Sequence, residues 1–181
     1  MNLSLVKLLV PVMLLTMSGC ASLSKKECMA ADWEDVGIRD GANGRPEEYL
    51  IQHSTACARV GVAPDRERWL RGREKGLDRF CVPHRAFQAG EYGGGFDAGI
   101  CRNYDQDRLV FAYEAGRDIY QRTSELTAID TEMRDIHTAL ENKELEKKER
   151  ERLAFRLGVL TVQRVDAQRA LEDARYRGRD L

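Results

Sequence analysis

Residues 125–160 read ELTAIDTEMRDIHTALENKELEKKERERLAFRLGVL, and they hold the pattern that decides the fold. Apolar residues recur there at alternating steps of three and four, the spacing of a helix face that packs against another helix. The first seam consists of Leu126, Ile129, Met133, Ile136 and Leu140. The second seam is one residue out of phase and consists of Leu153, Leu157, Leu160, Ala167 and Leu171, with Arg164 as an interruption. The pattern predicts an all-α fold with long helices in this half.

The segment between the two seams, residues 141–152, is too charged to continue either of them. It holds five acidic and five basic residues and one apolar residue, Leu145, and the first register continues onto Lys143, Lys147 and Arg150. A turn near residues 142–146 explains the lost register and buries one seam against the other in an antiparallel, coiled-coil-like hairpin. The alternative is one continuous helix that dimerises through each seam separately. We favour the hairpin, because helices joined by a short connection usually pack on each other.

Smaller helices are expected upstream, in residues 24–105. Ser24 and Glu27 form a capping-box pattern that opens a helix through about Arg39. A second helix begins at Glu47, and Pro64 marks the start of a third. The stripe of the second helix holds Leu50, His53, Cys57 and Val60, and that of the third holds Trp69, Gly72, Arg73, Gly76, Leu77 and Phe80. A short turn or helix follows from Pro83 to Gly90, and Gly93–Gly95 then interrupt regular structure.

An aromatic residue is followed three or four positions later by glycine in a weak internal repeat. Its copies are Trp33 and Gly37, Trp69 and Gly72, Phe87 and Gly90, Phe96 and Gly99, and Tyr113 and Gly116. A glycine inside a helix costs about 1 kcal/mol relative to alanine, so repeated use indicates a packing reason. We expect close helix contacts beside the aromatic rings. The functional alternative is that these faces form a ligand groove, for example for glycan.

The N-terminus resembles the signal of a bacterial lipoprotein. Lys7 is followed by the apolar run from Leu8 to Leu15 and then by Met17-Ser18-Gly19-Cys20, a lipobox-like sequence. The resemblance implies that residues 1–19 are cleaved, that Cys20 receives diacylglycerol and a fatty acyl group, and that residues 20–23 form an acylated tether. Ala21 follows the cysteine in place of the aspartate associated with retention in the inner membrane. An outer-membrane, periplasm-facing protein is therefore expected.

The four other cysteines form an even set in a chain expected to reach an oxidising compartment. They are Cys28, Cys57, Cys81 and Cys101. Two disulfides allow three connectivities, and loop closure is least demanding for neighbours, so we expect Cys28 with Cys57 and Cys81 with Cys101. The rival is a metal site, because His53 and Cys57 are four residues apart on one helix face. No Cys-x-x-Cys pair accompanies them, so no metal is expected.

The charge balance of the chain limits which classes of partner it can attract. The part after residue 19 has 28 basic and 30 acidic residues, so it has no net field with which to attract nucleic acid. A local excess of positive charge lies between Arg59 and Arg85, where there are eight basic and four acidic residues. We interpret it as a solvated helix face, the alternative being an anion-binding face for lipid headgroups or cell-wall polymer.

Several of these motifs together resemble a family of proteobacterial lipoproteins grouped as domain of unknown function family 2799. The resemblance lies in Asp32-Trp33, Gly37, Asp40-Gly41 and Gly44, then His53, Cys57, Gly61-Val62 and Pro64-Asp65, then Gly72-Arg73, Gly76-Leu77 and Phe80-Cys81, then Cys101, Phe111, Tyr113, Gly116-Arg117 and Tyr120. It covers nearly the whole part after the signal and implies membrane anchorage and a shared small fold. The family has no established chemistry to transfer.

Two functions are consistent with these features. The first is a non-enzymatic adaptor: a disulfide-stapled head in residues 24–105 lies at the membrane, and the hairpin of residues 106–181 binds an envelope protein. The second is a cell-wall ligand binder or an enzyme acting on envelope glycan, with His53, His84 or Asp65 as polar groups. No nucleotide-binding loop is present, Gly93–Gly95 lack the helix start of a phosphate cradle, and no nucleophile motif surrounds Ser54 or Ser124. We expect no cofactor and no catalytic residue.

Overall fold

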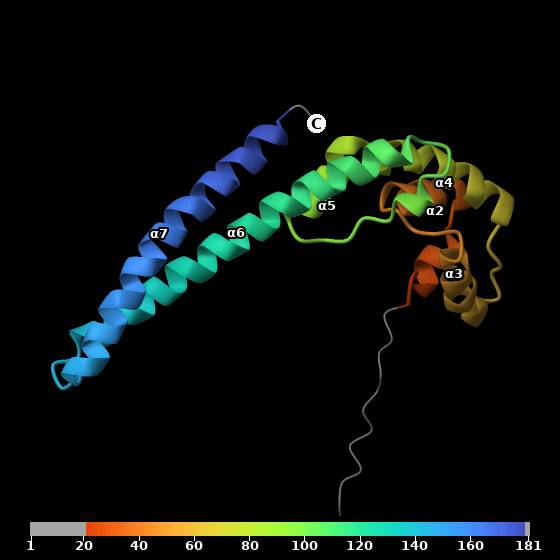
Figure 1. Ribbon diagram of the computed structural model, residues 1–181. Helices are drawn as coiled ribbons and strands as arrows, with labels where there is room; N and C mark the ends of the chain where they lie inside the picture. The colour runs from red at the N-terminus through yellow and green to blue at the C-terminus, as the bar shows by residue number, and fades with distance from the viewer. Residues whose placement is uncertain (1–20, 180–181) are drawn as a thin grey trace, which may run out of the picture.

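The computed structural model describes residues 21–179 (Figure 1). Seven α-helices and two 3₁₀ turns make up its regular structure, and no strand occurs in that range. None of the helices in this part of the chain combines the length and apolar character needed to cross a membrane. The elements are α1 (Lys25–Met29), α2 (Trp33–Ala42), α3 (Tyr49–Cys57), η1 (Ala58–Val60), α4 (Arg66–Phe80), α5 (Pro83–Glu91), η2 (Ala98–Ile100), α6 (Gln106–Glu141) and α7 (Lys147–Arg177).

The first predicted helix is two helices. Ser24 caps α1 as expected, with the full capping box to Glu27. The chain then leaves helical geometry, and the Asp32 side chain accepts hydrogen bonds from the backbone N–H groups of Glu34 and Asp35. Because Asp32 satisfies these free donors, it begins a new helix where a continuous one was predicted.

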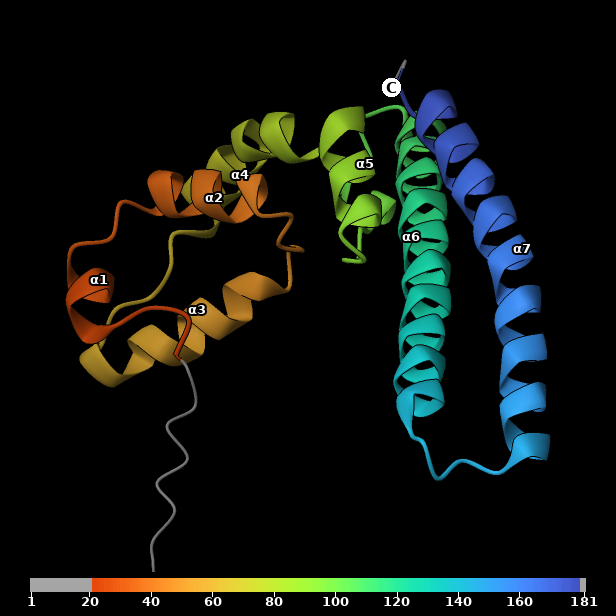
Figure 2. The ribbon, with the colours of Figure 1, turned by 90° about the vertical axis from the view of Figure 1, so that its left-hand side faces the viewer.

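Glycines bring α2 and α4 into backbone contact, as the repeat predicted. A Cβ at Gly72 would lie under 3.0 Å from the Glu34 carbonyl oxygen, and one at Gly76 would meet the Ile38 oxygen equally closely. Gly37 and Gly41 on α2 are just as close to the backbone of α4. The contacts advance in step along both helices, so α2 and α4 run in the same direction, side by side (Figure 2).

The pair formed by α5 and α6 repeats this arrangement. A Cβ at Gly90 would overlap the Tyr113 carbonyl oxygen, and one at Gly116 would overlap that of Phe87. The sequence spacing matches as well. Nine positions separate Cys28 from Gly37 and Cys81 from Gly90, and fifteen separate Cys57 from Gly72 and Cys101 from Gly116. The head thus contains two related units, each with one disulfide and one glycine-mediated helix pair.

The long hairpin is present as predicted. Helices α6 and α7 lie side by side and extend away from α1–α4, with the turn at the far end (Figures 1 and 2). Ile136 from the first seam and Leu160, Ala167 and Leu171 from the second are buried. The single continuous helix is therefore the wrong alternative.

Charged residues that interrupt the two seams form hydrogen bonds and ion pairs between α6 and α7. The Arg150 guanidinium donates to the carbonyl oxygens of Leu140 and Asn142, which end α6. Arg164, the interruption of the second seam, pairs with Asp130 on α6 at 2.6 Å. Two further pairs join the helices, Arg156 with Glu132 and Arg177 with Asp118.

The predicted boundary at residues 105 and 106 does not separate two cores. Leu109 and Ala112 on α6 belong to the same buried cluster as Ala86 and Cys101 of the head. Farther along, Ile119 packs with Leu171 and Ala174 of α7. The first turns of α6 are therefore part of the head, and the end of α7 returns to it.

Candidate functional site

Two disulfides close the head. Cys28 is bonded to Cys57 with Cα atoms 5.4 Å apart, and Cys81 to Cys101 with Cα atoms 5.7 Å apart. This is the predicted pairing of neighbours, and it uses the sulfur of Cys57 that the zinc alternative required. Across residues 21–179, no group of three or more His, Cys, Asp or Glu side chains is arranged to hold a metal ion. Cys20, the predicted lipid attachment, lies outside the described residues.

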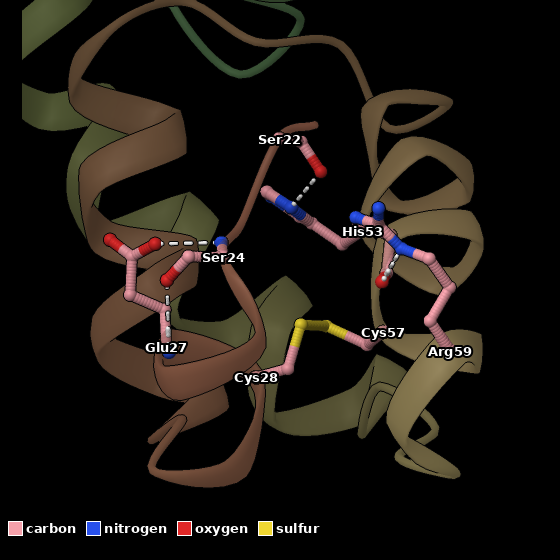
Figure 3. The surroundings of a disulfide bond; sticks show 8 residues. Ser22, Ser24, Glu27, Cys28, His53, Cys57 and Arg59 are labelled. Atoms are coloured by element: carbon pink, nitrogen blue, oxygen red, sulfur yellow. Dashed lines mark hydrogen bonds between the residues drawn. A yellow bond between two sulfur atoms is a disulfide. The ribbon is translucent and has the colours of Figure 1, made fainter. Parts of the chain in front are cut away.

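A buried polar network occupies the centre of the first unit. Oδ2 of Asp40 accepts hydrogen bonds from the indole of Trp69 at 2.8 Å and lies 2.8 Å from Nε2 of His53. The other ring nitrogen of His53 is 2.9 Å from the hydroxyl of Ser22 (Figure 3). His53 is only 2 % exposed, so the network is enclosed. Both ring nitrogens are occupied within the protein, which makes His53 a structural link rather than a group facing a substrate.

The network and the core take up most of the predicted tether. Ser22 is held by His53, and Leu23 is 5 % exposed in the same cluster as Cys28 and Trp33. The predicted tether of residues 20–23 is therefore too long, since Ser22 and Leu23 belong to the folded head. Leu23 is apolar and lies beside the first helix, so its burial there is favourable. The folded head begins two residues after Cys20.

The other candidate catalytic groups are not brought together. Asp65 caps α4 by accepting from the Arg68 backbone N–H, and His84 is exposed on α5. No hydrogen bond between described residues joins either of them to His53. The glycan-acting site suggested by these three residues therefore does not exist as a cluster.

The basic stretch of residues 59–85 is mostly a solvated helix face, with several charges paired across to other elements. Arg68 binds Asp32 at 2.7 Å, Lys75 binds Glu34, and Arg66 lies 3.7 Å from Glu47. The hydrogen bond from Lys75, followed by the positive charge of the same residue, lowers the pKa of the Glu34 carboxyl. Arg73 is the exception, because it is 4 % exposed and lies on the buried side of α4.

Arg73 lines a polar cavity of about 680 Å³. Its Nε donates to the carbonyl oxygen of Arg45 at 2.7 Å. The cavity lies between α4, the segment before α3 and the segment around η2. Its other lining residues are Pro46, Glu47, Glu48, Glu74, Leu77, Asp97, Gly99, Ile100, Arg102, Asn103 and Tyr104. The sequence placed Arg73 on a stripe with Trp69 and Leu77, and an arginine on such a stripe is the signal that could have identified this cavity.

Tyr104 fixes one wall of the cavity. Its hydroxyl donates to Asp78 at 2.8 Å, which ties the segment after η2 to α4. Burial, followed by the hydrogen bond to the Asp78 carboxylate, raises the pKa of Tyr104 to about 12. The phenol is therefore neutral at every physiological pH, and it acts as a fixed hydrogen-bond donor.

A second, shallower groove of about 760 Å³ follows α6 from the end of α5. Exposed Tyr92 and Tyr120 lie at its head-proximal end, and an uncharged stripe leads away from them along about two and a half helical turns. The stripe consists of Thr123, Ser124, Thr127, Ala128 and Thr131, all exposed. Glu132 and Asp135 end the stripe on the side toward the hairpin turn.

Comparison with known proteins agrees with the predicted resemblance in the family that it names, but over a shorter range than the nearly complete coverage expected from the sequence. Neither the curated proteins nor the solved structures that were compared gave a match. A family model described as protein of unknown function (DUF2799) matches residues 32–118. That range begins at the cap of α2 and ends within the first turns of α6, so it spans both glycine-mediated helix pairs. Residues 32–118 of this chain, which comprise most of the head and the first turns of α6, are therefore similar to the DUF2799 family.

Proposed function

We propose that this protein is a non-enzymatic, lipid-anchored adaptor of the bacterial cell envelope, attached through Cys20 to the periplasmic face of the outer membrane. Its anchored head would hold the α6–α7 hairpin toward a protein partner. The uncharged stripe of α6 in this groove, whose edges are formed by Glu91, Glu132, Asp135 and Arg175, is the observation that carries this proposal. In a chain with 33 % charged residues, an exposed stripe without charge over about two and a half turns indicates contact with another molecule.

The start of the head supports direct anchorage. Leu23 is in the core and Ser22 is bonded to His53, so only Ala21 separates the acyl-bearing cysteine from the fold. An anchor at Cys20 would hold the head against the membrane surface, and the two disulfides suit an oxidising compartment.

The surface of the groove is less polar than its serine and threonine residues suggest, because three of their hydroxyl groups form hydrogen bonds within α6. Ser124, Thr127 and Thr131 each donate to the carbonyl oxygen four residues earlier on α6. With those protons used inside the helix, the threonine methyl groups remain for contact with a partner. Tyr92, 78 % exposed, and Tyr120, 46 % exposed, add aromatic area at one end.

The occupant proposed here is a helix of an envelope protein. The groove runs along α6 from Tyr120 to Asp135, which spans about 22 Å at 1.5 Å per residue and suits four turns of a helix. Glu132 and Asp135 would favour a basic residue at the matching end of that helix.

Photo-crosslinking in intact cells tests the proposal. A photoreactive residue replaces Thr127 in the groove, and the matched control replaces Gln168, an exposed residue of α7 outside the groove. At native expression, the Thr127 probe should yield one reproducible envelope protein that the Gln168 probe does not. A blank at Thr127, or the same products from both positions, would refute the adaptor function.

A further inference from the structure

Arg73 holds a buried positive charge without a carboxylate partner. Among the described residues, no carboxylate oxygen lies within 4.0 Å of its nitrogens, and its one hydrogen bond uses Nε. Burying an unpaired charge is costly, so such a group usually has an anionic partner. The hydrogen bond to the Arg45 carbonyl oxygen satisfies only the Nε donor of Arg73.

The two Nη atoms of Arg73 open on the polar cavity. No side-chain nitrogen or oxygen of the described residues is sealed from solvent without a hydrogen-bond partner. Since the Nη atoms make no hydrogen bond in the structure, they are reached through the cavity that Arg73 lines. The outer edge of a guanidinium offers paired N–H donors, which match the two oxygens of a carboxylate.

Four acidic residues and a second cation, the exposed Arg102, line the same space, so acidic groups outnumber basic ones there. Glu47 is engaged by Arg66 at 3.7 Å, and Asp97 accepts from the Gly99 backbone. Glu48 and Glu74 form no ion pair with the described residues, and both are exposed at the cavity. A pure anion would be repelled by these two carboxylates, whereas a ligand that also carries an ammonium group would be attracted to them.

We propose that the cavity binds a small zwitterion of dipeptide size, with its carboxylate on the Nη atoms of Arg73 and its ammonium group between Glu48 and Glu74. Leu77 and Ile100 provide apolar surface for a side chain of the ligand. The volume of about 680 Å³ falls within the range of small-molecule sites. This site is in the head, so it is independent of the groove on α6.

The two related units provide a matched control. Gly72-Arg73 on α4 corresponds to Gly116-Arg117 on α6. Arg117 is exposed, lies over the Tyr113 ring and pairs with Glu114 at 3.9 Å. It shares the sequence context of Arg73 without the cavity.

Isothermal titration of the full mature protein in detergent, with dialanine as the probe, tests this site. Dialanine should bind saturably, and both dialanine amide and N-acetyl-dialanine should bind at least about tenfold more weakly because each lacks one charge. Arg73→Lys should weaken dialanine binding by a similar factor, because lysine lacks the paired donors, while Arg117→Lys should leave it unchanged.

The double variant Glu48→Gln, Glu74→Gln changes only exposed residues and probes the ammonium end even if Arg73→Lys fails to fold by circular dichroism. It should reduce the affinity for dialanine and leave that for N-acetyl-dialanine unaltered. Absence of saturable dialanine binding at millimolar concentration would overturn the proposal. So would equal binding of dialanine amide, or inorganic phosphate displacing dialanine with equal affinity, which would indicate a simple anion site.

Discussion

Gly72 and Gly158 show how far the surroundings of a glycine decide its role. Both lie inside helices, where glycine is unfavourable in itself. Gly72 lies where α4 touches the backbone of α2, and a Cβ there would overlap the Glu34 carbonyl group. Gly158 on α7 has nothing within 4 Å of the corresponding position. The first glycine is required by packing, and the second is not.

Alanine at these two positions should therefore have opposite effects. Gly72→Ala forces α2 and α4 apart and should lower the free energy of unfolding by about 3 kcal/mol or more. Gly158→Ala should raise it by about 0.5 to 1 kcal/mol, because alanine restricts the unfolded chain and favours the helix. Urea unfolding followed by circular dichroism measures both, and equal effects from the two variants would contradict the packing account.

Tyr104 should make the free energy of unfolding depend on pH in the alkaline range. Its pKa of about 12 in the folded protein exceeds the ordinary value of 10, so folding favours the neutral phenol. The resulting stabilisation is complete below pH 10 and is lost as the pH rises from 10 to 12. The free energy of unfolding should fall over this range, and Tyr104→Phe should remove part of that fall. An unchanged pH profile in Tyr104→Phe would show that the phenol is not shielded as described.

At the scale of elements, the hairpin was predictable and the first helix was not. The alternation of three and four from Leu126 to Leu140, and its loss at Lys143, are local signals, and they gave the positions of α6, the turn and α7. The sequence predicts Asp32 inside one helix, because its capping role depends on the chain leaving helical geometry just before it. Such a break is decided by the packing of α1 and α2 on different neighbours.

The seam of the hairpin should carry its stability. Leu160 is 1 % exposed between α6 and α7, so Leu160→Ala should cost about 2 to 5 kcal/mol of unfolding free energy. Phe155 on the same helix is 77 % exposed, and Phe155→Ala should cost less than about 0.5 kcal/mol. Thermal unfolding of the two variants provides the comparison, and a larger effect at Phe155 would indicate that this ring is covered by another copy or partner.

The disulfide of the first unit should be a major support of the head. Cys28 and Cys57 close a loop with a sequence separation of 29, for which the chain-entropy model gives about 3 to 4 kcal/mol. The double variant Cys28→Ala, Cys57→Ala should lower the stability by roughly that amount and leave α7 helical. A stability equal to that of the wild type would mean that the bond does not constrain the unfolded chain.

Across the described chain, the sequence predicts most of the helices and both disulfides, but it does not predict most of the contacts between separate segments. The all-α class, both disulfides and the glycine contacts follow from short-range patterns and from cysteine spacing. The network of Asp40, His53 and Trp69 joins the three consecutive helices α2, α3 and α4 through side chains 13 and 29 residues apart, so no helix spacing rule reveals it. The same holds for the cavity of Arg73, whose walls come from three separate segments.

The head and the hairpin also form a more continuous structure than the predicted boundary at residues 105 and 106 allowed. The first turns of α6 complete the second glycine-mediated pair, and the end of α7 packs beside Ile119. A partner bound along α6 would therefore contact an element that begins in the core of the head. That continuity makes the position of the hairpin depend on the orientation of the head.

Anchorage through Cys20 is the claim on which the proposed function depends. The most direct test is intact-mass analysis of the protein recovered from the separated inner-membrane, outer-membrane and soluble fractions of its own cells, beside the variant Cys20→Ala. The wild-type chain should begin at Cys20, carry the mass of diacylglycerol and a fatty acyl group, and be found in the outer membrane, while Cys20→Ala should be unprocessed or soluble. A Cys20→Ala protein that is correctly cleaved and still membrane-bound, or a wild-type chain without lipid, would contradict the account.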